Sequence, residues 1–232
     1  MRKPPRPQRH PDPPCRRRRK AVAGVCITGA GLLGASLSTP PGSAPFYVLS
    51  LGAAGTWLIG GLQTGCVHLG WQQAAPPSLR AVAAPIATGV AAFGFFYSVA
   101  RIAHRIPVLN EAISSVLRYA QKGSDPLVTL TALANGVGEE VFFRGAVFTT
   151  VENRHPVLAS TAIYTLTATA TRNPALMLAS GAMGMLFGLQ RQATGGIQAP
   201  MLTHLTWSTL MLRFLPPLLH DPPIAQHRRT RA

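Results

Sequence analysis

Two adjacent glutamates, Glu139 and Glu140, lie in the middle of the apolar segment 127–151, and Arg144 follows four residues after Glu140. The chain has only seven acidic residues, and the other five lie near the ends of apolar segments or in expected loops. A carboxylate in hydrocarbon costs about 2.5–3.5 kcal/mol on insertion scales. We therefore expect that two carboxylates at the same depth of an apolar segment serve the function of the protein.

The spacing of these residues suggests two different roles for the glutamates. On a helix, Glu140 and Arg144 share a face, whereas Glu139 points about 100° away from Glu140. One carboxylate can pair with Arg144 while the other faces a cavity. Because the guanidinium favours the ionised form and burial opposes it, a carboxylate held between these effects is a candidate general base. A buried ion pair that only locks helix packing is the alternative.

A candidate partner is His204, the histidine that lies clearly inside an apolar segment, with Ser208 four residues later on the same helix face. Polar groups in a membrane helix tend to face a cavity or one another. We therefore expect His204 to be functional, and a satisfied structural histidine is the alternative. A tight turn near 153–156 would place position 168 at the depth of Glu139, and this position holds Ala168.

The elements that must position these residues are apolar segments of a membrane protein. Only 12% of the residues are charged, about half the usual share of roughly 25%. We predict an all-α, polytopic helical bundle with about seven transmembrane segments. The membrane domain would cover 21–219, with the segments 21–38, 46–67, 81–100, 127–151, 157–171, 174–190 and 197–218. Residues 101–125 have the apolar spacing of an interfacial helix, and a short soluble helix is the alternative.

The basic residues gather at the ends of the chain. Nine of the 22 lysines and arginines fall in residues 1–20, directly before the first apolar segment. This predicts a disordered basic tail that anchors a cytoplasmic N-terminus at the cell membrane and contacts membrane lipids. Nothing in the pattern favours nucleic-acid binding. Seven crossings would place the basic C-terminal tail, 220–232, on the opposite side, against the positive-inside trend, so the number of crossings stays open.

Two motifs give these residues a family context. The first reads Glu-Glu-x-x-x-Arg-Gly from Glu139 to Gly145, and the second reads Gly-x-x-x-Gly and then Ala-Pro-x-x-x-His-x-x-x-Ser from Gly184 to Ser208. Together they resemble the CAAX-protease and bacteriocin-processing (CPBP) intramembrane proteases, also called abortive-infection proteins. The resemblance covers about residues 127–212 and implies an intramembrane protease fold.

The chain departs from the family pattern at two positions. The middle motif, Phe-x-x-x-His, is best matched from Tyr164 to Ala168, so its histidine is missing, and Ser208 replaces the closing asparagine. The resemblance implies that Glu139 activates a water, while the histidines and the asparagine orient water, bind a metal or stabilise the oxyanion. Zinc is possible on this resemblance, but a zinc site normally needs three protein ligands. The sequence offers His204 and Glu139, with Glu140 as a further carboxylate.

These observations lead to one main expectation and two alternatives. The main one is an intramembrane endopeptidase of the CAAX-protease type, in which Glu139 is the base, Glu140 and Arg144 position it, and His204 and Ser208 bind substrate or oxyanion. The substrate would be a peptide or a membrane-protein segment. The first alternative is a catalytically impaired relative that acts as a membrane scaffold or regulator, which Ala168 favours. The second is a small transporter, for which the sequence shows no repeat.

Overall fold

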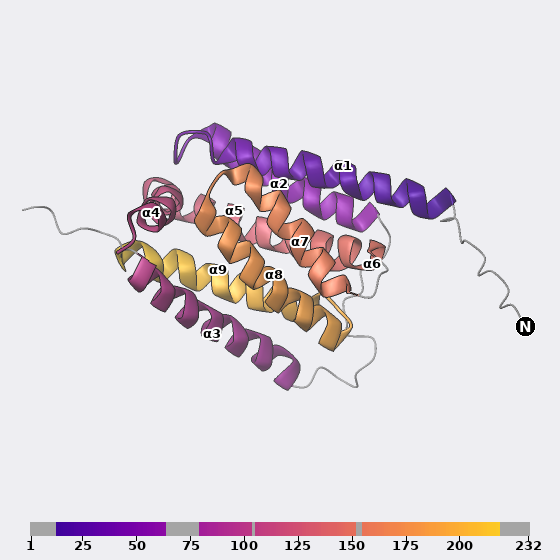
Figure 1. The fold of residues 1–232 in the computed structure, drawn as a ribbon. Helices are drawn as coiled ribbons and strands as arrows, with labels where there is room; N and C mark the ends of the chain where they lie inside the picture. Colours follow the sequence, from indigo (N-terminus) through magenta and orange to yellow (C-terminus); the bar gives the residue numbers. More distant parts are fainter. Residues whose placement is uncertain (1–12, 64–78, 104, 152–154, 219–232) are drawn as a thin grey trace, which may run out of the picture.

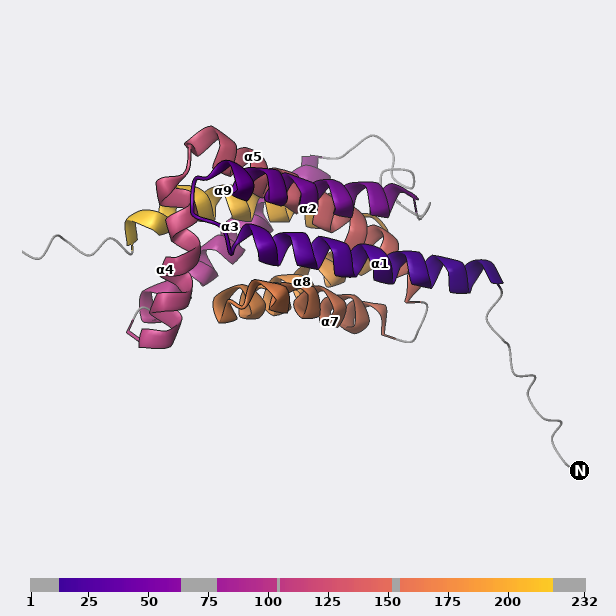
Figure 2. The same cartoon turned by 90° about the horizontal axis from the view of Figure 1, so that it is seen from above.

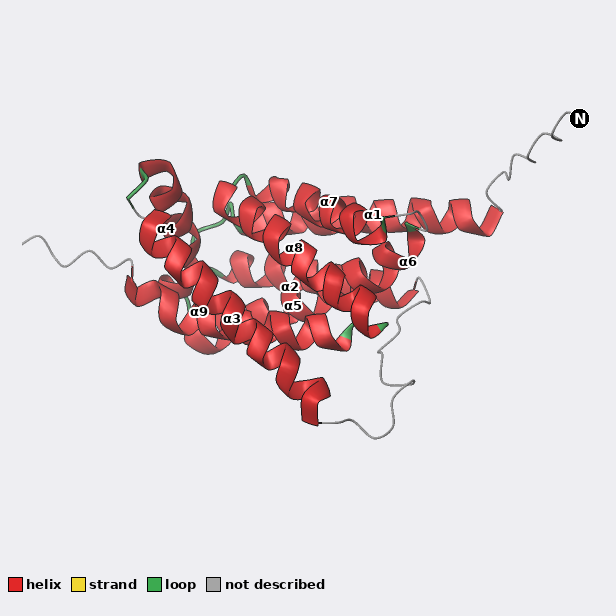
Figure 3. Ribbon diagram, turned by 60° about the horizontal axis from the view of Figure 1, so that its bottom comes forward, coloured by secondary structure: helices red, strands yellow, loops and turns green. Residues whose placement is uncertain are grey.

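The computed structural model of the protein describes residues 13–63, 79–103, 105–151 and 155–218. Within these ranges every regular element is a helix, so the predicted all-α fold is confirmed (Figure 3). In chain order the elements are α1 (Pro13–Ser36), α2 (Ala44–Gln63), α3 (Leu79–Ala103), α4 (Pro107–Lys122), α5 (Asp125–Glu139), the π-helix η2 (Glu140–Val147), α6 (Phe148–Thr150), α7 (Pro156–Ala168), the 3₁₀ turn η3 (Thr169–Thr171), α8 (Pro174–Thr194) and α9 (Gln198–Leu218).

The long helices lie side by side, and α4 crosses one end of the bundle that they form (Figures 1 and 2). Each of the seven expected segments corresponds to a helical stretch, with α5, η2 and α6 together forming the fourth. Several helices begin where proline favours a first turn, because the proline ring fixes a helical φ and its missing N–H is not needed there. Pro107, Pro126, Pro156 and Pro174 stand at such positions.

One of the predicted boundaries changes, the start of the first helix. The first helix begins at Pro13, so residues 13–20 are helical rather than part of the expected disordered tail. Arginine and lysine are good helix formers, and a helix that continues into the apolar residues after Lys20 can extend over them. Residues 1–12 and the basic tail 220–232 lie outside the described residues.

By length and apolar composition, two described helices could cross a membrane, α2 and α3. The fourth segment is divided among α5, η2 and α6, and α7 has only 13 residues. Length and apolar composition alone therefore support two of the seven expected transmembrane segments.

An aromatic core joins α1 and α2 to the π-helix. Trp57 of α2 is buried against Phe142 and Phe143 of η2, with ring centroids 5.1 and 5.0 Å apart. The backbones approach closely around it: a Cβ on Gly138 would lie 2.6 Å from the carbonyl oxygen of Ala54, and a Cβ on Gly29 would lie 2.4 Å from the indole. Small residues at these points allow α1, α2 and α5 to fix the position of the segment that carries the glutamates.

Candidate active site

The two glutamates lie where the fourth segment changes its helical form. Glu139 is the last residue of α5, and Glu140 is the first residue of the π-helix that continues to Val147. The expectation of one continuous α-helix is wrong here. A π-helix closes i→i+5 hydrogen bonds, is rare, and occurs often at functional sites. All eight residues of η2 are buried.

Glu140 is the centre of a dry polar cluster. Its Oε1 accepts a hydrogen bond from Nη1 of Arg144 at 3.3 Å and lies 2.9 Å from Nδ1 of His204. Glu140 and Arg144 are fully buried, and His204 is 6% exposed. The expected pairing of one glutamate with Arg144 is therefore present, and Glu140 is the one that makes it. The cluster also joins η2 to α9, which begins 58 residues later in the sequence.

Several groups hold the Arg144 guanidinium in place. Its Nη2 donates to the carbonyl oxygen of Gly184 in α8 at 3.3 Å. Its carbon Cζ lies 4.5 Å from the centroid of the Tyr164 ring and 5.0 Å from that of Phe187, both within cation–π range. Phe187 also stacks on the His204 ring, with centroids 4.7 Å apart. One planar stack therefore orients both the guanidinium and the imidazole.

Glu139 points away from this cluster. Its Oε2 accepts a hydrogen bond of 2.6 Å from the hydroxyl of Tyr164, and its side chain lines a cavity of about 180 Å³. Taking roughly 30 Å³ for each water molecule, such a space holds about six waters. The expectation that one carboxylate pairs with Arg144 while the other faces a cavity agrees with this geometry.

The same cavity collects three of the six positions expected at the site from the sequence, Glu139, Ala168 and His204. His204 lines it, and Ala168 lies in its wall, so the antiparallel packing of α7 does bring position 168 to the depth of Glu139. Ser208 is half-buried one turn beyond His204, and α9 contributes Trp207 rather than Ser208 to the wall. The full lining is Leu33, Trp57, Glu139, Phe143, Tyr164, Thr167, Ala168, Thr171, Leu176, Ala179, Ser180, Met183, His204 and Trp207.

Two further residues, which were not among those expected at the site, hold it together. Tyr164, noted only as the aromatic of the middle motif, bonds to Glu139 and stacks on Arg144. Arg191 is buried, and its Nε donates to the carbonyl oxygen of Arg144 at 2.9 Å. Tyr164 could have been predicted from its position one turn before Ala168, on the same helix face. Arg191 could have been predicted from its position as a cation near the end of an apolar segment.

The donor set does not fit zinc. A zinc site needs three or four nitrogen, sulfur or carboxylate ligands around one point. Across the described residues no three His, Cys, Asp or Glu side chains converge in this way. Nδ1 of His204 and Nη1 of Arg144 both contact Oε1 of Glu140. The groups that remain available to a ligand in the cavity are the Glu139 carboxylate and the other imidazole nitrogen. What these groups can do together is remove a proton from a water and donate hydrogen bonds to a polarised oxygen.

Comparison with known proteins gives one match. Residues 124–210 match the sequence model of the family described as type II CAAX prenyl endopeptidase Rce1-like. Neither the curated proteins nor the solved structures gave a match. The matched stretch runs from the start of α5 into α9 and contains both glutamates, Arg144 and His204. The resemblance noted in the sequence is thereby confirmed. Over residues 124–210, which are 87 of its 232 residues, the chain is similar to the Rce1-like type II CAAX prenyl endopeptidases.

Proposed function

We propose that the protein is a membrane-embedded endopeptidase that hydrolyses a peptide bond with water activated by Glu139. The observation that carries the proposal is the placement of the Glu139 carboxylate on a cavity that His204 also lines. Tyr164 holds one carboxylate oxygen, Oε2. The other oxygen, Oε1, is then the acceptor for a proton from a water bound in the cavity.

The proposed reaction has two steps. Glu139 takes a proton from the water as the water oxygen bonds to the carbonyl carbon, which gives a tetrahedral intermediate with a negative oxygen. The carboxylic acid of Glu139 then gives this proton to the leaving amine as the C–N bond breaks. Collapse of the intermediate gives a carboxylic acid and an amine, which exchange a proton to become a carboxylate and an ammonium group, and Glu139 returns to its ionised form.

Glu140 and Arg144 have a positioning role in this scheme. Because Nδ1 of His204 lies on Oε1 of Glu140, the other ring nitrogen, Nε2, remains for the substrate. We propose that the Nε2 side of the His204 ring faces the reacting carbonyl group of the substrate. The role of Ser208 as a second donor stays a prediction and requires a substrate that extends along α9.

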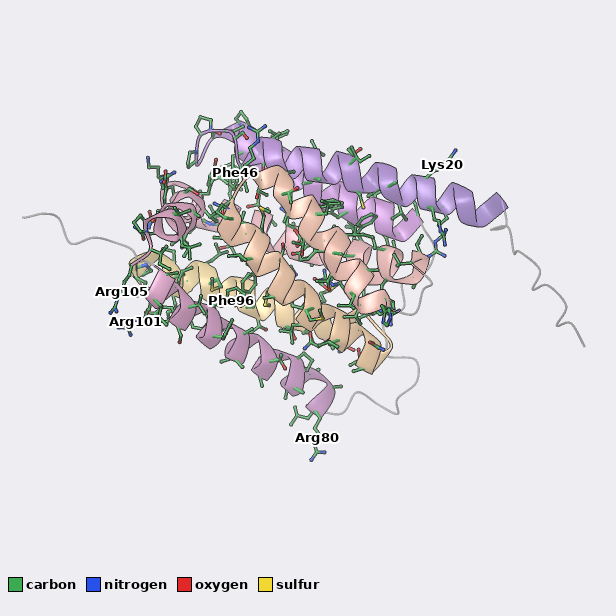
Figure 4. The ribbon with its side chains drawn as sticks, in the orientation of Figure 1. Lys20, Phe46, Arg80, Phe96, Arg101 and Arg105 are labelled. Atoms are coloured by element: carbon green, nitrogen blue, oxygen red, sulfur yellow. The ribbon has the colours of Figure 1, made fainter. Side chains whose placement is uncertain are left out.

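A multi-pass arrangement in the cell membrane is part of the proposal. Large apolar side chains are exposed on helices all around the bundle, among them Ile27 (74%), Val48 (68%), Phe95 (62%), Leu166 (69%) and Leu178 (66%). Exposed apolar surface on this scale suits contact with lipid rather than water. Charged residues stand at the two ends of the bundle, Lys20 and Arg80 at one and Arg101 and Arg105 at the other (Figure 4). A helix of 20 residues, such as α2, spans about 30 Å, the thickness of a bilayer core.

We further propose that seven helical passes cross the membrane, with the N-terminus in the cytoplasm and α4 at the opposite interface. By family resemblance, the substrates would be prenylated C-termini, leader peptides or segments of membrane proteins. Lipids of the surrounding bilayer would be the other partners.

A scaffold without catalysis is the second candidate, and Ala168 favours it. Its methyl group lies in the cavity wall where the family motif has a histidine, and the described residues bring no second imidazole to the cavity. Such a protein would keep the cavity and bind a partner without cleaving it.

Hydrolysis by the purified protein in lipid nanodiscs would separate these candidates. The probes are a prenylated CAAX peptide and a set of unprenylated apolar peptides, with products read by mass spectrometry. We expect cleavage by the wild type, loss of cleavage by Glu139→Gln, and full cleavage by Glu111→Gln, a matched change on exposed α4. Equal product from Glu139→Gln and wild type would refute the role of Glu139 as base. If no peptide is cleaved, and a membrane partner is retained equally by wild type and Glu139→Gln, the scaffold is favoured.

A further inference from the structure

The cavity at Glu139, here called the inner cavity, has a neighbour at the end of the bundle that α4 crosses. This outer cavity has a volume of about 160 Å³. Its lining comes from the end of α1, the loop after it, α4 and the turn between α7 and α8. The residues are Leu37, Pro41, Ser115, Val116, Arg118, Tyr119, Thr171 and Asn173.

The two cavities lie end to end. Thr171 lines both of them. Leu37 of the outer cavity follows directly after α1, and its backbone N–H donates at 3.2 Å to the carbonyl oxygen of Leu33, which lines the inner cavity. At the start of α8, Asn173 of the outer cavity accepts a hydrogen bond of 3.0 Å from the backbone N–H of Leu176, which lines the inner one. Three separate elements thus pass directly from one cavity to the other.

Hydroxyl groups mark the way from Glu139 to this junction. Thr167, Thr171 and Ser180 line the inner cavity, and each donates its hydrogen to a carbonyl of its own helix at 2.7, 2.7 and 2.8 Å. Their oxygens keep free lone pairs, which can accept from water or from a peptide N–H. From Tyr164, which bonds to Glu139, to Thr171 the wall runs for seven residues, about 10 Å along the helix.

Towards the other end of the bundle, Glu139 is closed off by apolar side chains. Phe143 and Val147 follow it along η2, and both are fully buried. Trp57 and Val22 complete this cluster, with Val151 packed against it. A peptide carries an N–H and a C=O in every residue that must stay paired away from water. The one polar side-chain group of this cluster is the indole N–H of Trp57, whereas the opposite wall carries the hydroxyl oxygens of Thr167, Thr171 and Ser180.

The outer rim is fixed rather than loose. Nδ2 of Asn173 donates to the carbonyl oxygen of Ala112 at 2.8 Å and to Oγ of Ser115 at 2.9 Å, which ties α4 to the start of α8. The hydroxyl of Tyr119 donates to the carbonyl oxygen of Leu37 at 2.6 Å, which ties α4 to the end of α1. These bonds hold α4 beside the outer cavity as one edge of an opening.

We infer that water and an extended peptide reach Glu139 from the end of the bundle crossed by α4, past Thr171 and Thr167, and not from the Lys20 end. For the peptide, this inference rests on the proposed function. For water, it rests on the cavities alone, so it can be tested in a protein that cleaves nothing.

Cysteine labelling tests the route. In the full chain with Cys15, Cys26 and Cys66 changed to serine, single variants Thr167→Cys and Thr150→Cys are treated with a charged, membrane-impermeant thiol reagent. Thr150 is the matched control, because it is buried in α6 on the far side of the aromatic cluster. Only the hydrated thiolate reacts, so we expect Thr167→Cys to react at least about tenfold faster than Thr150→Cys. The variants Lys20→Cys and Arg105→Cys report which face of the membrane the reagent can reach.

The face of the membrane from which the reagent reaches position 167 distinguishes the two possible routes. We expect Thr167→Cys to react from the face that labels Arg105→Cys, and adding Thr171→Trp to slow the reaction at least about tenfold by filling the junction. Labelling from the Lys20 face, or a rate at position 167 no higher than at position 150, would overturn the inference. If Thr167→Cys does not fold, Ser180→Cys on the opposite wall gives the same reading. Adding Glu139→Gln to each variant should leave labelling unchanged, so this result stands apart from any failure of the proposed hydrolysis.

Discussion

Removal of one hydroxyl group, in Tyr164→Phe, tests how the proposed base is held. The Tyr164 hydroxyl donates to Oε2 of Glu139 at 2.6 Å, a charge-assisted bond worth about 1.5–3 kcal/mol. The phenylalanine ring keeps the packing against Phe143 and the stack on Arg144. If the bond orients the carboxylate in the transition state, its loss should lower kcat by about 10- to 150-fold, since 1.36 kcal/mol corresponds to a factor of ten.

The assay is peptide hydrolysis in nanodiscs, with kcat and KM measured separately and thermal unfolding followed on the same sample. We expect KM to change little, because Tyr164 contacts the base rather than a substrate group. The matched control is Tyr97→Phe, which removes a hydroxyl from a packed tyrosine of α3 away from the site and should leave kcat unchanged. Full activity in Tyr164→Phe would show that this hydroxyl does not position Glu139. An equal fall in both variants would indicate a general loss of folded protein.

Three further predictions concern the rest of the site. Ala168→His should raise kcat/KM about 10²- to 10³-fold in the hydrolysis assay if it returns a hydrogen-bonding group to the cavity wall, the inverse of losing one oxyanion donor; no increase in a folded variant would contradict this role for position 168. Arg144→Met leaves Glu140 buried beside His204 alone and should destabilise the protein by about 3–5 kcal/mol in a denaturation experiment, and an unchanged midpoint would contradict the buried-pair reading. His204→Ala should lower kcat about 10²- to 10³-fold, whereas Ser208→Ala should cost less because Ser208 lies outside the cavity wall; the reverse order would assign the donor to Ser208.

The helices and the grouping of the site could be predicted because local rules decide them. Apolar stretches bounded by proline gave the helical segments within a few residues. The pairing of Glu140 with Arg144 follows from helix spacing, and the depth of Ala168 follows from an antiparallel turn. The tail before Ala21 was mispredicted because charge content alone was used, although an adjoining helix can extend over good helix formers.

Other features depended on contacts that sequence spacing does not encode. The change from α- to π-helix at Glu140 has no composition signal. The bond from Tyr164 to Glu139 joins residues 25 positions apart, and the bond from His204 to Glu140 joins residues 64 apart. Such partners are chosen by packing between helices rather than by any local pattern.

The two glutamates of the proposed site differ in their partners and their surroundings. Oε1 of Glu140 has two partners, and its Oε2 has none but is fully buried, so Glu140 is a poorer base than Glu139 in the proposed reaction. Glu139 has one partner and borders the cavity. The neighbouring carboxylates thus lie in two different environments, one dry and one bordering the cavity. In the proposed mechanism the dry carboxylate orients an arginine and a histidine, while the other accepts a proton. An adjacent acidic pair in an apolar segment is therefore better explained by one reacting group and its support than by two equivalent ligands.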